Sequence, residues 1–299
     1  MMTPELPTQI VSAESRTFWQ ELWDYRYLLR NLVARDLKVR YKHSIFGILW
    51  SLLNPLLIMA VFTVVFSKFR AGGLYAFPIF VLVGIMPWNT FSGSLIGGTH
   101  SILNNAPLIK KVYFPRIILP TTIVLSNLVN FLIMLVILIV LLFYFGIGLT
   151  IHALWIPVIL LAQILFTLGL VYFLSAAQVY FRDIGQILDV GILAAFFLTP
   201  VFYPLEDFCR TTLLGITFDP ARVMRWLNPM ASIIDAYRTV LWGHLVVANC
   251  GTADHIKVYA PPTGMGADFI LRTMLTCLLV LLLGFLFFRR VEGRFAEEL

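Results

Sequence analysis

Residues able to do chemistry are sparse in this 299-residue chain, in which only 13% of residues are charged. The sequence contains no GxxxxGK[ST], HExxH or GxSxG motif, which argues against a P-loop of its own and against a hydrolase site. Its cysteines show no CxxC or Cys/His metal-ligand spacing, so no metal site is expected. We therefore expect a chain that binds and moves molecules rather than one that transforms them.

The clearest functional pattern is a cationic run that leads directly into an apolar stretch. The run consists of Arg35, Lys38, Arg40 and Lys42. Lys and Arg stay with the cytoplasmic leaflet, whereas an apolar run enters the bilayer. Residues 100–120, HSILNNAPLIKKVYFPRIILP, are too polar to face lipid, and we expect a short helix and turns there on the same side. Membrane topology thus explains the net charge of +6, and no nucleic-acid binding is expected.

Apolar stretches must position these residues. With 60% hydrophobic residues and a mean hydropathy of +0.87, the chain is too apolar for a soluble domain. A helix needs ~20 apolar residues to cross a bilayer. The expected fold is an all-α membrane protein with six transmembrane helices, near residues 45–66, 77–98, 117–145, 154–180, 187–203 and 269–288. The distribution of Lys and Arg then places both termini in the cytoplasm.

An amphipathic helix is expected before the first span. Between residues 16 and 33 one helical face is apolar, with Trp19 and Trp23 beside it, which favours a helix lying in the membrane interface. Packing on a soluble partner is the alternative. Residues 1–43 would then form a cytoplasmic tail and interfacial helix. Residues 44–299 would form the transmembrane domain, including an outer region at 204–267.

The outer region allows two interpretations. Residues 226–248 are apolar enough for a seventh span, but Asp235, Arg238 and His244 would be costly in lipid. We favour two short helices, broken near Asn228–Pro229, that dip into the outer leaflet and return. Because Asp235 and Arg238 are three residues apart, an ion pair within the helix is as plausible as contact with a substrate.

Several segments resemble the membrane subunits of ABC-2 type exporters, above all permeases for O-antigen, teichoic acid and capsule polymers. They are RDLKVRYKHSIFGILWSLLNPLL at 35–57, PLIKKVYFPRIILP at 107–120, YFRDI at 180–184 and LNPMASIIDAYRTVLW at 227–242. The resemblance implies a homodimer in the cell inner membrane. It also implies two copies of a separate P-loop subunit that binds ATP and Mg, so this chain would need no cofactor and would not be an enzyme.

The implied activity is export of a lipid-linked, O-antigen-like polysaccharide from the cytoplasm to the outer face of the inner membrane. Export of a drug or lipid by the same mechanism is an alternative. A polytopic membrane transferase is a further one, although Glu206, Asp207, Asp235 and His244 lack catalytic spacing.

The resemblance also implies roles for particular residues. Coupling to the ATPase would fall on Asn104, Asn105, Lys110, Lys111 and Arg116, with Arg35, Lys38 and Arg40 nearby. Binding of lipid phosphate is the alternative for each of these cations. The outer gate would include Asn228, Asp235 and Arg238. Cys209 and Cys250 are candidates for a disulfide, and the sequence leaves the bond undecided because it gives no distance between them.

Aromatic side chains are the expected lining of a polysaccharide path, since rings stack on sugar faces without requiring one register. The candidates are Trp88, Phe91, Phe196, Phe197, Phe202 and Tyr203. Plain core packing is the alternative for each one. The group at 196–203 is favoured because proline interrupts a short fifth span there.

Overall fold

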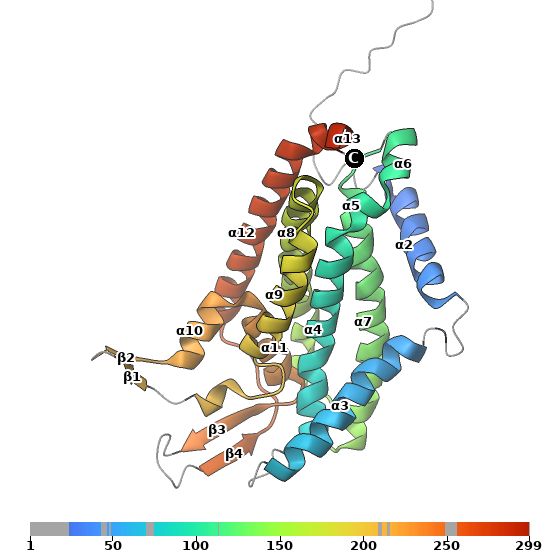
Figure 1. Cartoon of the computed structure of the whole chain (residues 1–299). Helices are drawn as coiled ribbons and strands as arrows, with labels where there is room; N and C mark the ends of the chain where they lie inside the picture. Colours follow the sequence, from blue (N-terminus) through green and yellow to red (C-terminus); the bar gives the residue numbers. More distant parts are fainter. Residues whose placement is uncertain are drawn as a thin grey trace, which may run out of the picture.

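The computed structural model describes residues 24–42, 47, 49–69, 75–112, 114–208, 211–213, 216–248 and 256–298. Within these ranges the chain is a bundle of long helices, with short helices at one end and small β-hairpins at the other (Figure 1). The hairpins are a departure from the expected all-α fold, although helices dominate.

Four described helices are long and apolar enough to cross a membrane. They are α4 (Phe77–Thr99), α7 (Ile118–Tyr144), α8 (Ile156–Tyr180, preceded by η1, Ile151–Trp155) and α12 (Ala267–Val291, followed by η3, Glu292–Arg294, and α13, Phe295–Glu298). Two further apolar helices are α3 (Leu49–Phe69) and α9 (Ile184–Leu198), whose apolar parts are shorter. These elements fit an all-α membrane protein, and the count of six spans remains a prediction.

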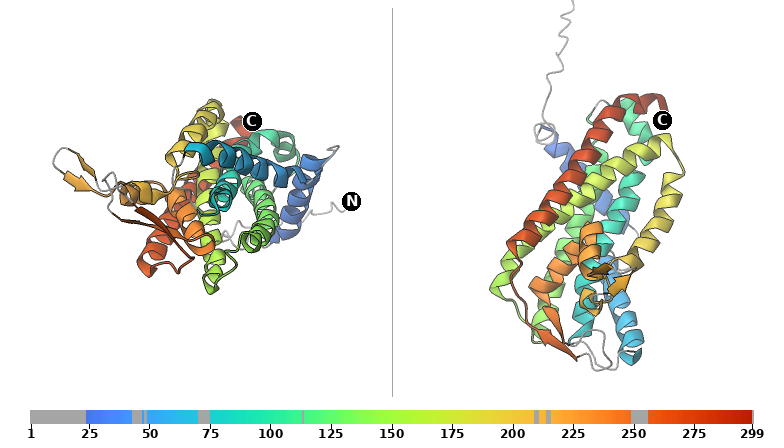
Figure 2. Two further views of the ribbon diagram at one scale, coloured as in Figure 1. Left: turned by 90° about the horizontal axis from the view of Figure 1, so that it is seen from below. Right: turned by 90° about the vertical axis from the view of Figure 1, so that its left-hand side faces the viewer.

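Helix α4 forms the centre of the bundle and packs against α3, α7, α8 and α11 (Pro229–Leu241). Helices α8 and α12 run side by side (Figure 2). They approach closely at Gly169 and Gly284, where a Cβ added to Gly284 would lie 1.9 Å from the Gly169 carbonyl oxygen. Small residues of this kind let the backbones of membrane helices meet.

The first described helix, α2 (Arg26–Tyr41), continues through the cationic run instead of ending before it. Its Leu32 is buried in a cluster with Phe114, Ile118 and Leu119. The described part of the expected lipid-facing surface therefore packs on α7 and the segment before it. Trp19 and Trp23, which were expected beside this surface, lie outside the described residues.

Short elements occupy both ends of the bundle. Helices α5 (Ser101–Asn104) and α6 (Ala106–Lys111) lie at the end that carries α13 (Figure 1). The opposite end holds η2 (Leu205–Asp207), α10 (Pro220–Leu227), α11 and two antiparallel hairpins. The hairpins are β1 (Thr211–Leu213) with β2 (Ile216–Phe218), and β3 (His244–Ala248) with β4 (Ile256–Ala260).

The segment considered as a seventh span is not one helix. It is divided at Asn228 into α10 and the 13-residue α11, and it ends in strand β3. Thirteen residues extend about 20 Å, well short of the ~30 Å hydrocarbon core. The expected break is therefore present, and the seventh-span alternative does not fit this geometry.

Candidate functional site

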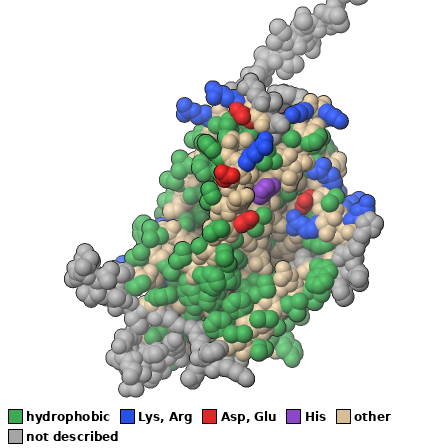
Figure 3. Space-filling view, viewed as in Figure 1, with side chains coloured by type: hydrophobic (Ala, Val, Ile, Leu, Met, Phe, Trp, Pro, Cys, Tyr) green, Lys and Arg blue, Asp and Glu red, His purple; other side chains and the backbone are tan. Residues whose placement is uncertain are grey.

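Charge is distributed unevenly over the molecule. Lys and Arg side chains gather near α6, α13 and α2, whereas the opposite half of the visible face is mainly hydrophobic (Figure 3). By the same charge rule that was applied to the sequence, the basic end would face the cytoplasm, and this orientation stays a prediction. The chain's candidate functional residues divide between this basic end, the opposite end and the helices between them.

The predicted aromatic residues come together in one cluster. The Trp88 ring lies 5.7 Å from Phe91 and 5.6 Å from Phe196, measured between ring centroids. The cluster continues through Phe196, Phe197, Phe202 and Tyr203, with neighbouring centroids 5.2–6.0 Å apart. These spacings suit tilted and edge contacts between rings. The structure thus joins residues of α4, of α9 and of the turn after α9.

Two cavities adjoin this cluster. One of about 540 Å³ has Trp88, Phe91 and Asn228 among its lining residues, together with apolar side chains of α10. Another of about 280 Å³ lies between α3, α4 and α9 and is lined by Trp88, Asn89 and Asp189 among others. Trp88 therefore lines both. Of the predicted path residues, Phe91 also lines the larger cavity and Phe196 the smaller one, and the larger cavity reaches the two helices on either side of Asn228.

Asn228 holds the turn between those two helices. Its side-chain oxygen accepts hydrogen bonds from the backbone N–H groups of Met230 (3.0 Å) and Ala231 (3.3 Å), and so caps α11. Its amide nitrogen donates to the hydroxyl of Thr199 at 2.8 Å. An Asn followed by Pro at the first helical position is a strong helix start. The cap thereby ties the α10–α11 turn to the end of α9.

Arg238 is buried, with 5% of its surface exposed, and its contacts are with the protein itself. Its guanidinium donates hydrogen bonds to the backbone carbonyls of Pro200, Val201 and Tyr203. The guanidinium carbon also lies 3.7 Å from the centroid of the Phe80 ring. The turn after α9 would otherwise leave these carbonyls without partners, which is costly in a buried site.

The ion pair expected within α11 is replaced by one between helices. Asp235 pairs with Arg225 of α10, with 2.9 Å between the carboxylate oxygen and Nε. Nearby, Arg272 of α12 donates to the Ser232 hydroxyl at 3.3 Å. The expected pair of Asp235 with Arg238 is wrong, because the Arg238 guanidinium is directed toward the carbonyls after α9. The predicted gate residues are thus tied into contacts within the protein.

Glu206 is an acidic group next to this network. Burial raises the pKa of its carboxyl above the usual value, and the negative charge of Asp235 adds to this effect. The positive charges of Arg225 and Arg238 oppose it. The carboxylate form is therefore disfavoured here relative to water.

The predicted coupling residues lie at the opposite, basic end. Arg35 of α2 donates to the side-chain oxygen of Asn105 at 3.1 Å, and this contact joins α2 to the short helices α5 and α6. Arg116 donates to the carbonyl of Glu292, so the same segment is tied to the end of α12. Asn104 is exposed, and so is Lys38. Hydrogen bonds thus link Arg35, Asn105 and Arg116 to the elements at this end, while their role in coupling stays a prediction.

Lys110 and Lys111 occupy the last turn of α6 and are exposed. A cavity of about 350 Å³ lies beside them, with Arg116, Arg289 and Glu292 in its lining. Positive charge on a protruding helix next to a hollow suits contact with an acidic surface or with lipid phosphate.

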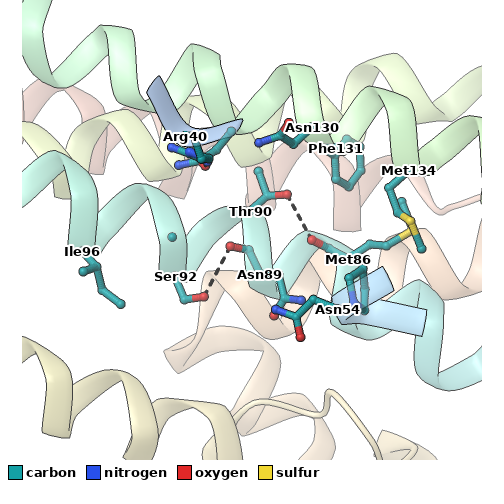
Figure 4. A pocket seen from close by; sticks show the side chains of 13 residues that line it. Arg40, Asn54, Met86, Asn89, Thr90, Ser92, Ile96, Asn130, Phe131 and Met134 are labelled. Carbon is teal, nitrogen blue, oxygen red and sulfur yellow. Dashed lines mark hydrogen bonds between the residues drawn. The ribbon is translucent and has the colours of Figure 1, made fainter. Parts of the chain in front are cut away.

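A polar pocket that the sequence reasoning missed lies between α2, α3, α4 and α7. It measures about 340 Å³, and its polar lining is Arg40, Asn54, Asn89, Thr90, Ser92, Asn127 and Asn130 (Figure 4). Arg40 was expected at the docking surface, but it faces this pocket. Its guanidinium donates to Asn127 at 2.7 Å and to Asp36 at 3.2 Å. The signal in the sequence was the presence of asparagine within apolar spans.

The disulfide proposed between Cys209 and Cys250 lies outside the described residues. The third cysteine, Cys277, is a buried free thiol in α12.

Comparison with known proteins agrees with this architecture. Residues 27–242 match the family described as ABC-2 type transporter. The chain is 40% identical over 226 residues to the O-antigen export system permease protein RfbA of Myxococcus xanthus, covering 75% of this chain and 84% of that protein. It is 29% identical over 273 residues to a protein of the same name from Klebsiella pneumoniae, covering 91% and 95% respectively. The chain therefore belongs to the ABC-2 type transporter family.

Proposed function

We propose that this chain is the membrane-spanning permease subunit of an ATP-driven exporter that carries a lipid-linked, O-antigen-like polysaccharide across the inner membrane. Its family makes it a transport subunit rather than an enzyme, and such permeases normally work with an ATP-binding subunit. The working assembly would be a homodimer with two copies of that subunit. Both termini would lie in the cytoplasm, and six helices would cross the membrane.

The observation that carries this proposal is the aromatic cluster around Trp88 and Phe196 together with its cavities. Aromatic rings stack on the apolar faces of sugars and tolerate sliding, because every ring in a polymer presents a similar face. The relatives are named as O-antigen export permeases, which favours a sugar polymer over a drug.

Coupling would begin at the basic end. ATP binding in the partner would push α5 and α6, and the hydrogen bond from Arg35 to Asn105 would pass that movement to α2. The polar anchors Asn228 and Arg238 would keep α10 and α11 in place over the aromatic cavity until α9 moves. In this mechanism the chain contributes binding surfaces and moving helices, and the partner contributes ATP hydrolysis.

A deletion experiment tests the proposal in the native host. Deleting the gene for this chain should remove long surface polysaccharide on gels of extracted lipopolysaccharide, while lipid-linked polymer accumulates inside the cell. Supplying the intact chain should restore the surface polymer. Unchanged surface polymer, with a lost resistance to drugs or an altered lipid composition, would instead support the alternative of drug or lipid export.

A further inference from the structure

The polar pocket beside α4 has a chemistry that differs from the aromatic cavities. Carboxamides and hydroxyls from three helices line it, contributed by Asn54, Asn89, Thr90, Ser92 and Asn130. No carboxylate lines it among the described residues. Its cation, Arg40, already pairs with Asp36. Such a lining offers many neutral donors and acceptors, which suits a neutral ligand rich in hydroxyl groups better than an anion.

Several of these amides are available to a ligand. The side-chain amides of Asn54 and Asn89 have no hydrogen-bond partner among the described residues, and Asn130 uses only its oxygen, which accepts from Tyr41 at 2.9 Å. Figure 4 shows Asn89 and Asn54 on one side of the pocket, with Arg40 and Asn130 on the other. Polar side chains in apolar spans normally satisfy one another. Amides left open toward a pocket therefore point to a ligand.

The rest of the pocket wall is apolar. Phe131 and Met134 of α7 are buried and contribute to it, as does Met86 of α4. A pocket that combines one aromatic wall with several amides has the two features that bind a sugar, namely a surface for the C–H face and partners for the hydroxyls.

The surroundings of the pocket suit an amphiphile. Asn54 is exposed, so the pocket opens at α3. Beyond Asn54, α3 exposes Leu57 (55%) and Val61 (60%), and α7 exposes Val136 (62%). A polyprenyl tail could lie along these apolar faces while a sugar occupies the pocket. Asn89 also lines the 280 Å³ cavity beside Trp88, so the pocket and that cavity are neighbours that share this residue.

We propose that this pocket, formed by Asn54, Asn89 and Asn130, binds the neutral sugar next to the lipid of a polyprenyl-linked saccharide before export. The inference rests on the proposed function, and it adds a substrate entry site separate from the aromatic cluster. Recognition there is of sugar hydroxyls, so a polyprenyl diphosphate without sugar binds the pocket weakly.

Cysteine protection tests the site directly. Asn89→Cys is placed in a chain whose Cys209, Cys250 and Cys277 are serine, and the complete complex with its ATP-binding subunit is put into nanodiscs. A hydrophilic thiol reagent is added with undecaprenyl diphosphate carrying one neutral sugar, or with undecaprenyl diphosphate alone. We expect the sugar-bearing lipid to slow labelling at least fivefold, and the sugar-free lipid to leave it unchanged. Asn31→Cys, on the exposed face of α2, serves as the control and should be labelled equally in all samples.

A second measurement is of ATP hydrolysis, in a chain that keeps its three natural cysteines. In the complete complex, Asn54→Ala with Asn89→Ala should raise about tenfold the concentration of sugar-bearing lipid that half-maximally stimulates ATP hydrolysis. Equal protection by both lipids would overturn sugar recognition at this pocket. The sugar-bearing lipid could also stimulate ATP hydrolysis without protecting Asn89→Cys and with the same half-maximal concentration in the double alanine variant. That result would place the sugar-binding site outside this pocket, while leaving the proposed function intact. Absence of any stimulation, together with normal surface polymer after gene deletion, would reject the proposed function itself.

Discussion

The two ends of the molecule use similar residues in different ways. At the end with α10 and α11, Arg238 is buried and bonded to three backbone carbonyls. At the basic end, Lys110 and Lys111 are exposed on a six-residue helix. Burial decides the role, because a buried cation without partners is expensive, whereas an exposed cation keeps most of its hydration. We therefore expect substitutions at the first end to affect folding, and those at the second to affect coupling.

The largest effect is expected for Arg238→Met. This change keeps an apolar side chain over Phe80 but leaves the carbonyls of Pro200, Val201 and Tyr203 without their donor. Each buried carbonyl left without a hydrogen-bond donor lowers the free energy of unfolding by roughly 1–3 kcal/mol. For the three carbonyls together we expect a loss of about 3 kcal/mol or more. Thermal unfolding of the purified protein in detergent measures it. Arg222→Met, at an exposed position of α10, is the control and should leave the melting temperature nearly unchanged. Equal melting of both variants would contradict the structural role of Arg238.

A second prediction concerns the space beside that guanidinium. A Cβ added to Gly84 would lie 2.4 Å from the Val201 carbonyl oxygen and 2.7 Å from Arg238 Nη2. We expect Gly84→Ala to destabilise by about 1–3 kcal/mol, since overpacking displaces neighbouring groups. The matched control is Gly191→Ala in α9, where nothing lies within 4 Å of the new Cβ. Parallel melting curves should separate the two variants, and a stable Gly84→Ala protein would show that this contact is loose.

At the basic end, Lys110→Ala with Lys111→Ala should leave the melting temperature unchanged and reduce export severalfold. Both side chains are exposed, so stability does not depend on them. Export is measured as surface polymer in the deletion host, and Arg222→Ala at the other end is the control. Arginine at both positions should restore much of the activity if charge is what matters. A fall in melting temperature that accounts for the lost export would contradict a coupling role.

The smallest effect is expected at Glu206. Its folded-state pKa is raised by burial and by Asp235, so the folded protein binds more protons than the unfolded chain above about pH 4.5. The stability that the protonated carboxyl contributes is full below that pH and is lost as pH rises through the folded pKa. Glu206→Gln should therefore melt slightly higher than the natural protein near pH 7 and show a flatter pH profile. Identical pH profiles would show that Glu206 is well solvated.

Much of the fold follows from the sequence because long apolar stretches have few stable forms in a bilayer. The predicted spans at 77–98 and 117–145 correspond closely to α4 and α7. The break at Asn228 was also predictable, since Asn followed by Pro is a local signal for a helix start. The hairpin β3–β4 was missed, because its strands are short and follow directly on an apolar helix.

The sites were less predictable because they depend on contacts between distant segments. The aromatic residues were expected as a group, and the structure joins α4 to α9 through Trp88 and Phe196. The i,i+3 spacing of Asp235 and Arg238 predicted a pair, but tertiary contacts direct Asp235 to Arg225. The asparagine pocket depends on the position of α2, whose path through the cationic run the sequence did not indicate.

Reconstituted transport tests whether this chain and an ATP-binding subunit together carry a lipid-linked polysaccharide across a membrane. The chain and its ATP-binding subunit are placed in sealed proteoliposomes that contain a lipid-linked polysaccharide, and a glycosidase on the receiving side reports polymer that has crossed. We predict crossing only when ATP and both subunits are present, with no ATP hydrolysis by this chain alone. Crossing without ATP or without the second subunit, or hydrolysis by the purified chain, would contradict it.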